Sequence, residues 1–282
     1  MEDLKRVPLR PGAENRSYYK YYLKEFAKLP ADKAEFLKNP VGRTEDGLDI
    51  HERNRLFQPG YLPDERGVFS TADGGKLVAN NTKFLNATGE MLQWWFAWHG
   101  IDPLRYAIWD PFDHYGLDIS FEVRAKLLDP SLSLREKCCD IQHVVKESLV
   151  MGNPPDTLFL DFKKPEDMGY DETQIGTTAC SFFVGANVGI ESPLGRVPIV
   201  MTHTARDTAD GCELRSRFWM GYNIINAHPD NKGKIDNLVA QMEDRENGTR
   251  SYRVLRTTPD GLSYARDIAR RYGLDLEDIL EI

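Results

Sequence analysis

The sequence predicts an α+β fold whose centre is an antiparallel β-sheet. The β-rich stretches are short and are interrupted by Gly, Pro or Asp, as in sheets built from consecutive antiparallel strands. They are residues 117–127, 141–150, 157–163, 177–190, 197–206 and 211–220. Helical patterns occur near the two ends of the chain and in one segment between them. Strands do not alternate with helices, which argues against a doubly wound α/β fold.

Residues 1–50 are predicted to form an N-terminal helical extension, and residues 51–282 the main domain. The extension is rich in Lys, Glu and Tyr and ends near Asn39-Pro40-Val41-Gly42, a polar segment that interrupts regular structure. A hairpin over residues 67–80, with its turn at Asp73-Gly74, is expected at the start of the main domain. The extension is therefore expected to pack on the outside of the sheet.

The Trp-rich segment 86–99 predicts an amphipathic helix. Asn86 or Thr88 can cap its first turn, and Gly100 can end it. Spacings of three and four residues give the helix an aromatic face, made of Met91, Trp94, Trp95 and Trp98. This face either packs in the core or lines a pocket for an aromatic ligand. Two further helices are predicted after residue 221, at 236–242 and 261–272.

Charge and cysteine content exclude several classes of protein. The 282 residues contain 36 Lys and Arg against 44 Asp and Glu, and this net charge of −8 has the wrong sign for binding nucleic acid or an anionic membrane. The N-terminus lacks the apolar stretch of a signal peptide, so a cytoplasmic protein is predicted. Four cysteines show neither metal-ligand spacing nor a disulfide framework, and we expect them to be reduced: Cys138, Cys139, Cys180 and Cys212.

Arg105-Tyr-Ala-Ile-Trp-Asp-Pro-Phe-Asp-His114 is the densest group of reactive side chains in the sequence. It gathers an Arg, a Tyr, a Trp, two Asp and a His around one Pro turn. So many polar groups in a short span indicate a functional site, with His114 as its central candidate.

His143 and Glu147 form a second candidate, because a separation of four residues places both side chains on one face of a strand or helix. An imidazole and a carboxylate on one face can bind a divalent metal or act as an acid–base pair. They can also form a simple salt bridge. His143 and Glu147 form part of a functional site only if the His114 side chain faces them.

His203 and the strand that follows it form a third candidate. Alternation places Glu213, Arg215 and Arg217 on one face of that strand. These charges either neutralise one another or bind a polar ligand, since a guanidinium can hold a phenolate or carboxylate by two hydrogen bonds.

Three motifs together resemble the 2,4-diacetylphloroglucinol hydrolase and phloretin hydrolase family. They are Trp94-Trp-Phe-Ala-Trp-His99, Arg105-Tyr106-Ala-Ile-Trp109-Asp-Pro-Phe-Asp113-His114 and Leu214-Arg-Ser-Arg-Phe-Trp219, in the order of the family. The segment Tyr61-Leu-Pro-Asp-Glu-Arg-Gly67 also fits. The resemblance covers roughly residues 57 to 221.

The resemblance implies a helix-grip fold of the START and birch-pollen-allergen type, in which a curved antiparallel sheet closes around a long C-terminal helix. It implies a zinc-containing hydrolase that forms a homodimer. Such an enzyme cleaves the carbon–carbon bond between a polyhydroxylated aromatic ring and an acyl group, as in phloretin or an acylphloroglucinol. The cleavage is of retro-Claisen type: the ring is protonated at carbon, and water attacks the exocyclic carbonyl.

Site residues follow from the same resemblance. His114 matches the first zinc ligand, and Glu147 is the candidate for the second, although His143-Val-Val-Lys-Glu147 carries one residue more than the family's His-Val-Val-Glu. Tyr106 matches a tyrosine that contacts the substrate, while His203 and His143 are candidates to move protons. The remaining predicted contacts to the ring are Trp95, Trp98, Trp109, Arg215 and Arg217.

The C-terminus departs from the family, because no His-x-x-x-Glu pair follows residue 221. Catalytic zinc usually has three protein ligands, so His143, His203, His228 or Asp267 would have to complete the set. Three hypotheses remain: a metal-assisted hydrolase, a metal-free hydrolase, isomerase or cyclase acting on a similar polyphenol, and a non-catalytic carrier of aromatic ligands.

Overall fold

The strands in the described part of the chain form two antiparallel sheets. The computed structural model describes residues 5–25, 29–149, 153–192, 195–226, 229–244 and 250–257. The large sheet has eight strands in the order β1-β2-β8-β7-β6-β5-β4-β3, and the small sheet has the order β11-β10-β9. The strands are β1 (Gly67–Ser70), β2 (Lys76–Leu85), β3 (His114–Asp118), β4 (Ile141–Glu147), β5 (Asp156–Lys163), β6 (Phe182–Ser192), β7 (Gly195–Thr208), β8 (Gly211–Met220), β9 (Tyr222–Ile225), β10 (Lys234–Asp244) and β11 (Arg250–Thr257).

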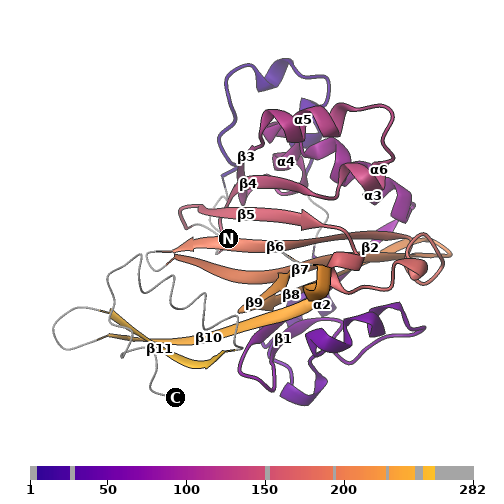
Figure 1. Cartoon of the computed structure of the whole chain (residues 1–282). Helices are drawn as coiled ribbons and strands as arrows, with labels where there is room; N and C mark the ends of the chain where they lie inside the picture. The colour runs from indigo at the N-terminus through magenta and orange to yellow at the C-terminus, as the bar shows by residue number, and fades with distance from the viewer. Residues whose placement is uncertain are drawn as a thin grey trace.

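The helices are short and gather mainly at the β3–β4 end of the large sheet (Figure 1). They are α1 (Tyr19–Tyr22), α2 (Ala31–Phe36), α3 (Gly89–His99), α4 (Pro103–Trp109), α5 (Phe121–Leu128) and α6 (Leu134–Lys137). Helix α3 contacts β6 and β7, and α4 contacts β3. Among the described residues, no helix has both the length and the apolar character to cross a bilayer.

The α+β prediction is confirmed, as are the hairpin and the Trp-rich helix. Strands β1 and β2 pair in register around the Asp73-Gly74 turn. Helix α3 begins after Thr88, whose side chain accepts a hydrogen bond from the Met91 N–H, and its C-cap is Gly100. Both elements are specified by local signals, namely turn residues and a capping side chain.

Two local predictions are wrong. The second half of the predicted stretch 117–127 is helix α5, because Ser120 caps the Val123 N–H and good helix formers follow. The predicted helix 236–242 is part of strand β10, which pairs with β9 on one side and β11 on the other. Pairing with the preceding and following strands overrides helix propensity there. The predicted helix 261–272 lies outside the described residues.

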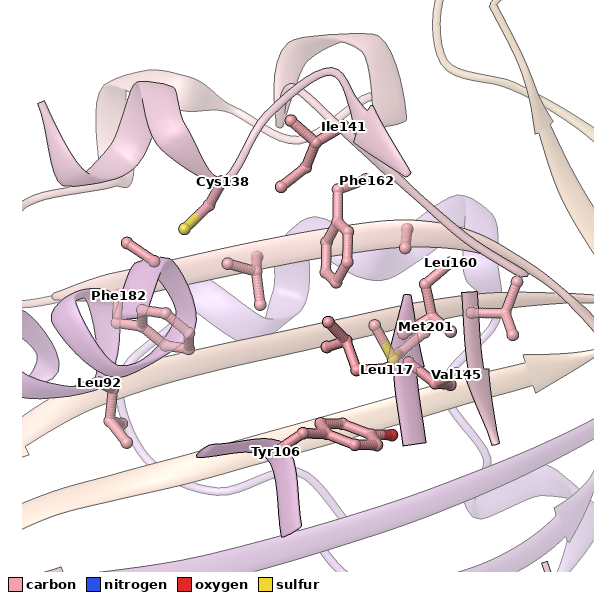
Figure 2. Close-up of a cluster of buried hydrophobic side chains, with 14 of the residues drawn as sticks. Leu92, Tyr106, Leu117, Cys138, Ile141, Val145, Leu160, Phe162, Phe182 and Met201 are labelled. Atoms are coloured by element: carbon pink, nitrogen blue, oxygen red, sulfur yellow. The ribbon is translucent and has the colours of Figure 1, made fainter. Parts of the chain in front are cut away.

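The large sheet carries a hydrophobic cluster on each face. On one face, side chains from β4 to β8 form one cluster with residues of α3 and α4. Figure 2 shows Val145, Phe162 and Met201 of the strands together with Leu92 of α3 and Tyr106 of α4. On the other face, Trp219 of β8 packs with the segment before β1, including the 3-10 helix η3 (Ile50–Phe57). The indole N–H of Trp219 donates to the Leu48 carbonyl at 3.0 Å. Both faces are therefore covered, and a side chain's direction on a strand decides which layer it enters.

Candidate functional site

A cavity of about 190 Å³ lies between the sheet and helices α3 and α4. Apolar side chains, among them Phe96, Leu160 and Phe218, form much of its wall. Seven of the ten predicted site residues also line it: Trp95, Tyr106, Trp109, His114, His143, Glu147 and His203. A buried, largely apolar cavity with a few converging polar groups is the usual form of a small-molecule site.

Tyr106, His114 and Glu147 form a tight cluster in the wall of this cavity. Pairing of β3 with β4 sets His114 opposite Glu147, with His114 Nε2 3.8 Å from Glu147 Oε1. Tyr106 comes from α4, whose start is set by the Asp102 side chain and by Pro103 at the first turn. Its hydroxyl donates to Glu147 Oε1, and its ring stacks on the His114 ring with centroids 4.0 Å apart.

The hydrogen bond at His114 Nδ1 determines the tautomer of this histidine. His114 Nδ1 lies 3.1 Å from the Tyr106 carbonyl oxygen, which can only accept a hydrogen bond. The proton is therefore on Nδ1, and Nε2 presents its lone pair toward Glu147. This arrangement of a carbonyl holding the remote nitrogen is the one found for histidines that bind metals.

Desolvation shifts the pKa values of two groups in this cluster, Glu147 and His114. Desolvation raises the pKa of Glu147 to about 7, because few polar groups replace the water around its carboxylate. Desolvation also lowers the pKa of His114 to about 4, so this imidazole is neutral at pH 7. A carboxyl group with a pKa near the working pH can either give or take a proton, as general acid–base catalysis requires.

Three more histidines line the cavity, and one of them was not among the predicted site residues. His203 Nδ1 lies 2.7 Å from the Ser216 hydroxyl, His143 projects from β4, and His99 is the last residue of α3. His99 is the missed residue. It follows Trp95 by four positions on the same helix, and that spacing was a usable signal, because it places both side chains on one face.

Because of these three histidines, we expect the free energy of unfolding to fall as the pH is lowered. Desolvation by burial lowers the pKa of His99 and His203 to about 4 and that of His143 to about 3. Between those values and pH 6.5 the unfolded chain binds more protons, so each histidine costs up to about 1.4 kcal/mol of stability per pH unit of acidification. Glu147, whose pKa is raised, acts in the opposite direction between pH 7 and 4.5.

Urea unfolding at pH 7 and at pH 5 measures this effect. The free energy of unfolding should drop at pH 5, and His143→Phe should reduce the drop because one buried titratable group is gone. An unchanged pH dependence in His143→Phe would show that His143 is not neutral and buried as described.

Trp98 was predicted to contact the substrate but is not among the residues that line the cavity. Its ring stacks on Trp94, with centroids 5.2 Å apart, and Tyr18 of the N-terminal segment meets it edge-on at 5.3 Å. The Arg105 guanidinium covers the Trp98 ring, with its central carbon 4.3 Å from the ring centroid. Trp98 therefore attaches the N-terminal segment to α3.

Arg215 and Arg217 do not reach the cavity either, which corrects their prediction as phenolate-binding residues. Alternation along β8 directs Phe218 into the cavity and both arginines to the opposite face of the sheet. There Arg215 pairs with Glu65, and Arg217 Nε lies 2.8 Å from Asp64 Oδ2. The geometry therefore supports mutual neutralisation of these charges rather than binding of a polar ligand.

The Arg217–Asp64 pair predicts a large stability effect. Both side chains are buried, at 0% and 1% exposure, so Arg217→Met leaves the Asp64 carboxylate without its cation. Breaking such a pair from one side costs about 3–5 kcal/mol. Chemical denaturation should show this loss, whereas Arg10→Met, which breaks the exposed Arg10–Asp118 pair, should change stability by less than about 1 kcal/mol. Equal effects of the two substitutions would contradict the assignment.

Metal-binding capacity in the described part of the chain rests on two side chains. His114 Nε2 and Glu147 Oε1 offer nitrogen and oxygen donors of the kinds that zinc accepts. Within the described residues, no group of three His, Cys, Asp or Glu side chains could hold an ion. His143 and His203 therefore do not complete such a set, while His228 and Asp267 lie outside the described residues.

Comparisons with known proteins agree with the motifs. A family model described as "DAPG hydrolase PhiG domain", where DAPG is 2,4-diacetylphloroglucinol, matches residues 48–256. Phloretin hydrolase of Eubacterium ramulus is 38% identical over 238 residues, covering 80% of this chain and 82% of that protein. A 2,4-diacetylphloroglucinol hydrolase of Pseudomonas protegens is 28% identical over 223 residues, covering 77% of this chain and 68% of that protein. The chain therefore belongs to the DAPG hydrolase family.

Proposed function

We propose that this protein hydrolyses the carbon–carbon bond between a polyhydroxylated aromatic ring and an acyl carbonyl, with phloretin or an acylphloroglucinol as substrate. The observation that carries the proposal is the Tyr106–Glu147–His114 cluster in the wall of an aromatic-lined cavity. A cavity of about 150 Å³ accommodates benzene, so a cavity of about 190 Å³ has room for one hydroxylated ring. Membership of the family supports the same reaction.

The reaction needs two proton movements. First, a ring hydroxyl loses its proton and the ring carbon that bears the acyl group gains one, which gives a keto form. Water then adds to the acyl carbonyl and loses a proton. The carbon–carbon bond breaks, its electrons restore the aromatic ring as a phenolate, and that phenolate takes up the proton lost by water. The products are the free phenol and a carboxylic acid.

We assign the first movement to His203. Its imidazole is neutral at pH 7, so it can accept the hydroxyl proton and return it to the ring carbon. The Ser216 hydroxyl, 2.7 Å from Nδ1, fixes the ring so that Nε2 is the nitrogen available for this transfer. The apolar neighbours Phe96 and Phe218, with ring centroids each 5.6 Å from that of His203, keep water from competing for the proton.

The second proton movement is the loss of a proton by the attacking water. Two of the residues near this step are of the kinds that bind zinc. His114 and Glu147 would be two of the protein ligands of a zinc ion, and bound zinc would supply a water of lowered pKa and polarise the carbonyl. Tyr106 donates to the acyl oxygen in this reading. The fixed tautomer of His114, with its Nε2 lone pair free, supports the assignment.

A metal-free variant of the same function rests on one specific observation. Burial raises the pKa of Glu147 to about 7, a value suited to a general base at neutral pH. In this reading Glu147 takes the proton from water, and Tyr106 again holds the acyl oxygen. A carrier without catalysis fits less well, because it has no need of six converging ionisable side chains.

Two measurements test the function. Purified protein incubated with phloretin should release phloroglucinol and 3-(4-hydroxyphenyl)propanoic acid in equal amounts, measured by liquid chromatography. Metal content by plasma mass spectrometry, with and without chelator, separates the two variants: the first predicts about one zinc per chain and loss of activity on chelation. Failure to cleave phloretin or any acylphloroglucinol would contradict the proposal.

The helix-grip architecture, a homodimeric assembly and a cytoplasmic location stay predictions from the sequence and its family resemblance. The long C-terminal helix of that architecture would fall within 258–282, outside the described residues.

A further inference from the structure

The cavity wall contains two histidines, His99 and His143, that have no role in the proposed mechanism. Its described lining residues include no Lys or Arg, and its ionisable groups are four histidines, one tyrosine and one glutamate. The described part of the wall therefore offers no Lys or Arg to pair with a phenolate. It can hold a neutral phenol, whose hydroxyl both donates and accepts hydrogen bonds.

His99 is a hydrogen-bond acceptor of fixed direction. Its Nδ1 lies 2.9 Å from the Trp95 carbonyl oxygen, so Nδ1 carries the proton and Nε2 carries the lone pair. The ring is held between Trp95 and Tyr106, with centroid distances of 5.8 and 5.9 Å and interplanar angles of 17° and 22°. His99 is thus a rigid acceptor in the cavity wall, and no described residue donates to its Nε2.

His143 lies beside His99, and its Nε2 has no hydrogen-bond partner among the described residues. The residue is 2% exposed, and this nitrogen is buried. The His99 and His143 rings meet edge-on with centroids 6.1 Å apart. Close packing holds His143 in place, because a Cβ on Gly100 would come within 2.7 Å of its Cε1. A buried imidazole nitrogen without a hydrogen bond is costly unless a ligand or water pairs with it.

We propose that His99 and His143 together bind one hydroxyl of the substrate ring and so select polyhydroxylated rings. The hydroxyl donates to His99 Nε2, and its oxygen accepts from an N–H of His143. This inference rests on the proposed function and adds to it. The two histidines are residues that determine specificity, distinct from the Tyr106–Glu147–His114 cluster and from His203.

Binding of phloroglucinol, the ring product, tests the pair without depending on turnover. Fluorescence of Trp95 and Trp109, which line the cavity, reports binding to the wild type, His99→Phe and His143→Phe. Each variant keeps an aromatic ring but loses the hydrogen bond, so the Kd for phloroglucinol should rise about tenfold. Benzene, which has the ring and no hydroxyl, should bind the variants at least as tightly as the wild type. His51→Phe, at an exposed position, is the matched control and should leave both affinities unchanged.

The conservative variant His99→Gln keeps an acceptor and should retain more phloroglucinol affinity than His99→Phe. Unchanged phloroglucinol binding in both Phe variants would overturn the inference, as would equal losses for phloroglucinol and benzene. If the wild type cleaves phloretin while the variants bind normally, only this inference fails. If the wild type neither binds phloroglucinol nor cleaves phloretin, the proposed function fails with it.

Discussion

Glu147→Gln is expected to lower kcat/KM for phloretin by about 10²–10⁴-fold, the usual contribution of a positioned acid–base group. The carboxyl is half-buried, accepts a hydrogen bond from the Tyr106 hydroxyl and has a pKa of about 7, whereas glutamine neither exchanges a proton nor serves as an anionic ligand. The loss is therefore expected whether Glu147 acts as a base or holds a metal. Steady-state kinetics at pH 7 measures it.

The protein should stay folded in this experiment, because glutamine has the same size and its amide oxygen can still accept from Tyr106. Glu90→Gln is the matched control, since Glu90 lies on α3 but is exposed. Full activity in Glu147→Gln, with near-wild-type stability, would show that the reacting group lies elsewhere.

His114→Ala is expected to reduce kcat/KM by about 10³-fold or more, because about 4 kcal/mol of transition-state stabilisation corresponds to that factor. The substitution removes the Nε2 lone pair 3.8 Å from Glu147 and the ring that stacks on Tyr106. Plasma mass spectrometry of the same variant distinguishes the two chemistries. Loss of bound zinc together with activity supports the metal-assisted route, and loss of activity from a protein that never held metal supports the metal-free route.

His51→Ala controls for removal of an imidazole as such, because His51 is exposed. If His114→Ala folds and turns over phloretin at the wild-type rate, then His114 has no part in the reaction. In that case the Tyr106–Glu147–His114 cluster would be a packing feature.

Elements with strong local signals could be predicted from the sequence. Helix α3 has a capping Thr88 and residues spaced three and four apart, and the β1–β2 hairpin has its Asp73-Gly74 turn. Strand β10 could not be predicted this way. Its residues form a strand because Asn237 pairs with Tyr222 of β9, and the local sequence holds no record of that pairing.

The candidate site, too, could be predicted only in part from local sequence signals. Alternation correctly places Glu213, Arg215 and Arg217 on one face of β8, but it does not tell which face holds the cavity, because both faces of this sheet are covered. The deciding partners, Asp64 and Glu65, lie about 150 residues earlier in the chain. Burial and polarity patterns alone could not connect them to the arginines.

Cleavage of phloretin in water enriched in ¹⁸O tests the central claim most directly. Hydrolysis at the acyl carbonyl predicts one ¹⁸O atom in the carboxyl group of 3-(4-hydroxyphenyl)propanoic acid and none in phloroglucinol, with product formation strongly reduced in Glu147→Gln. Mass spectrometry of both products reads the result. Recovery of intact phloretin, or of an isomer of the same mass, would contradict the account.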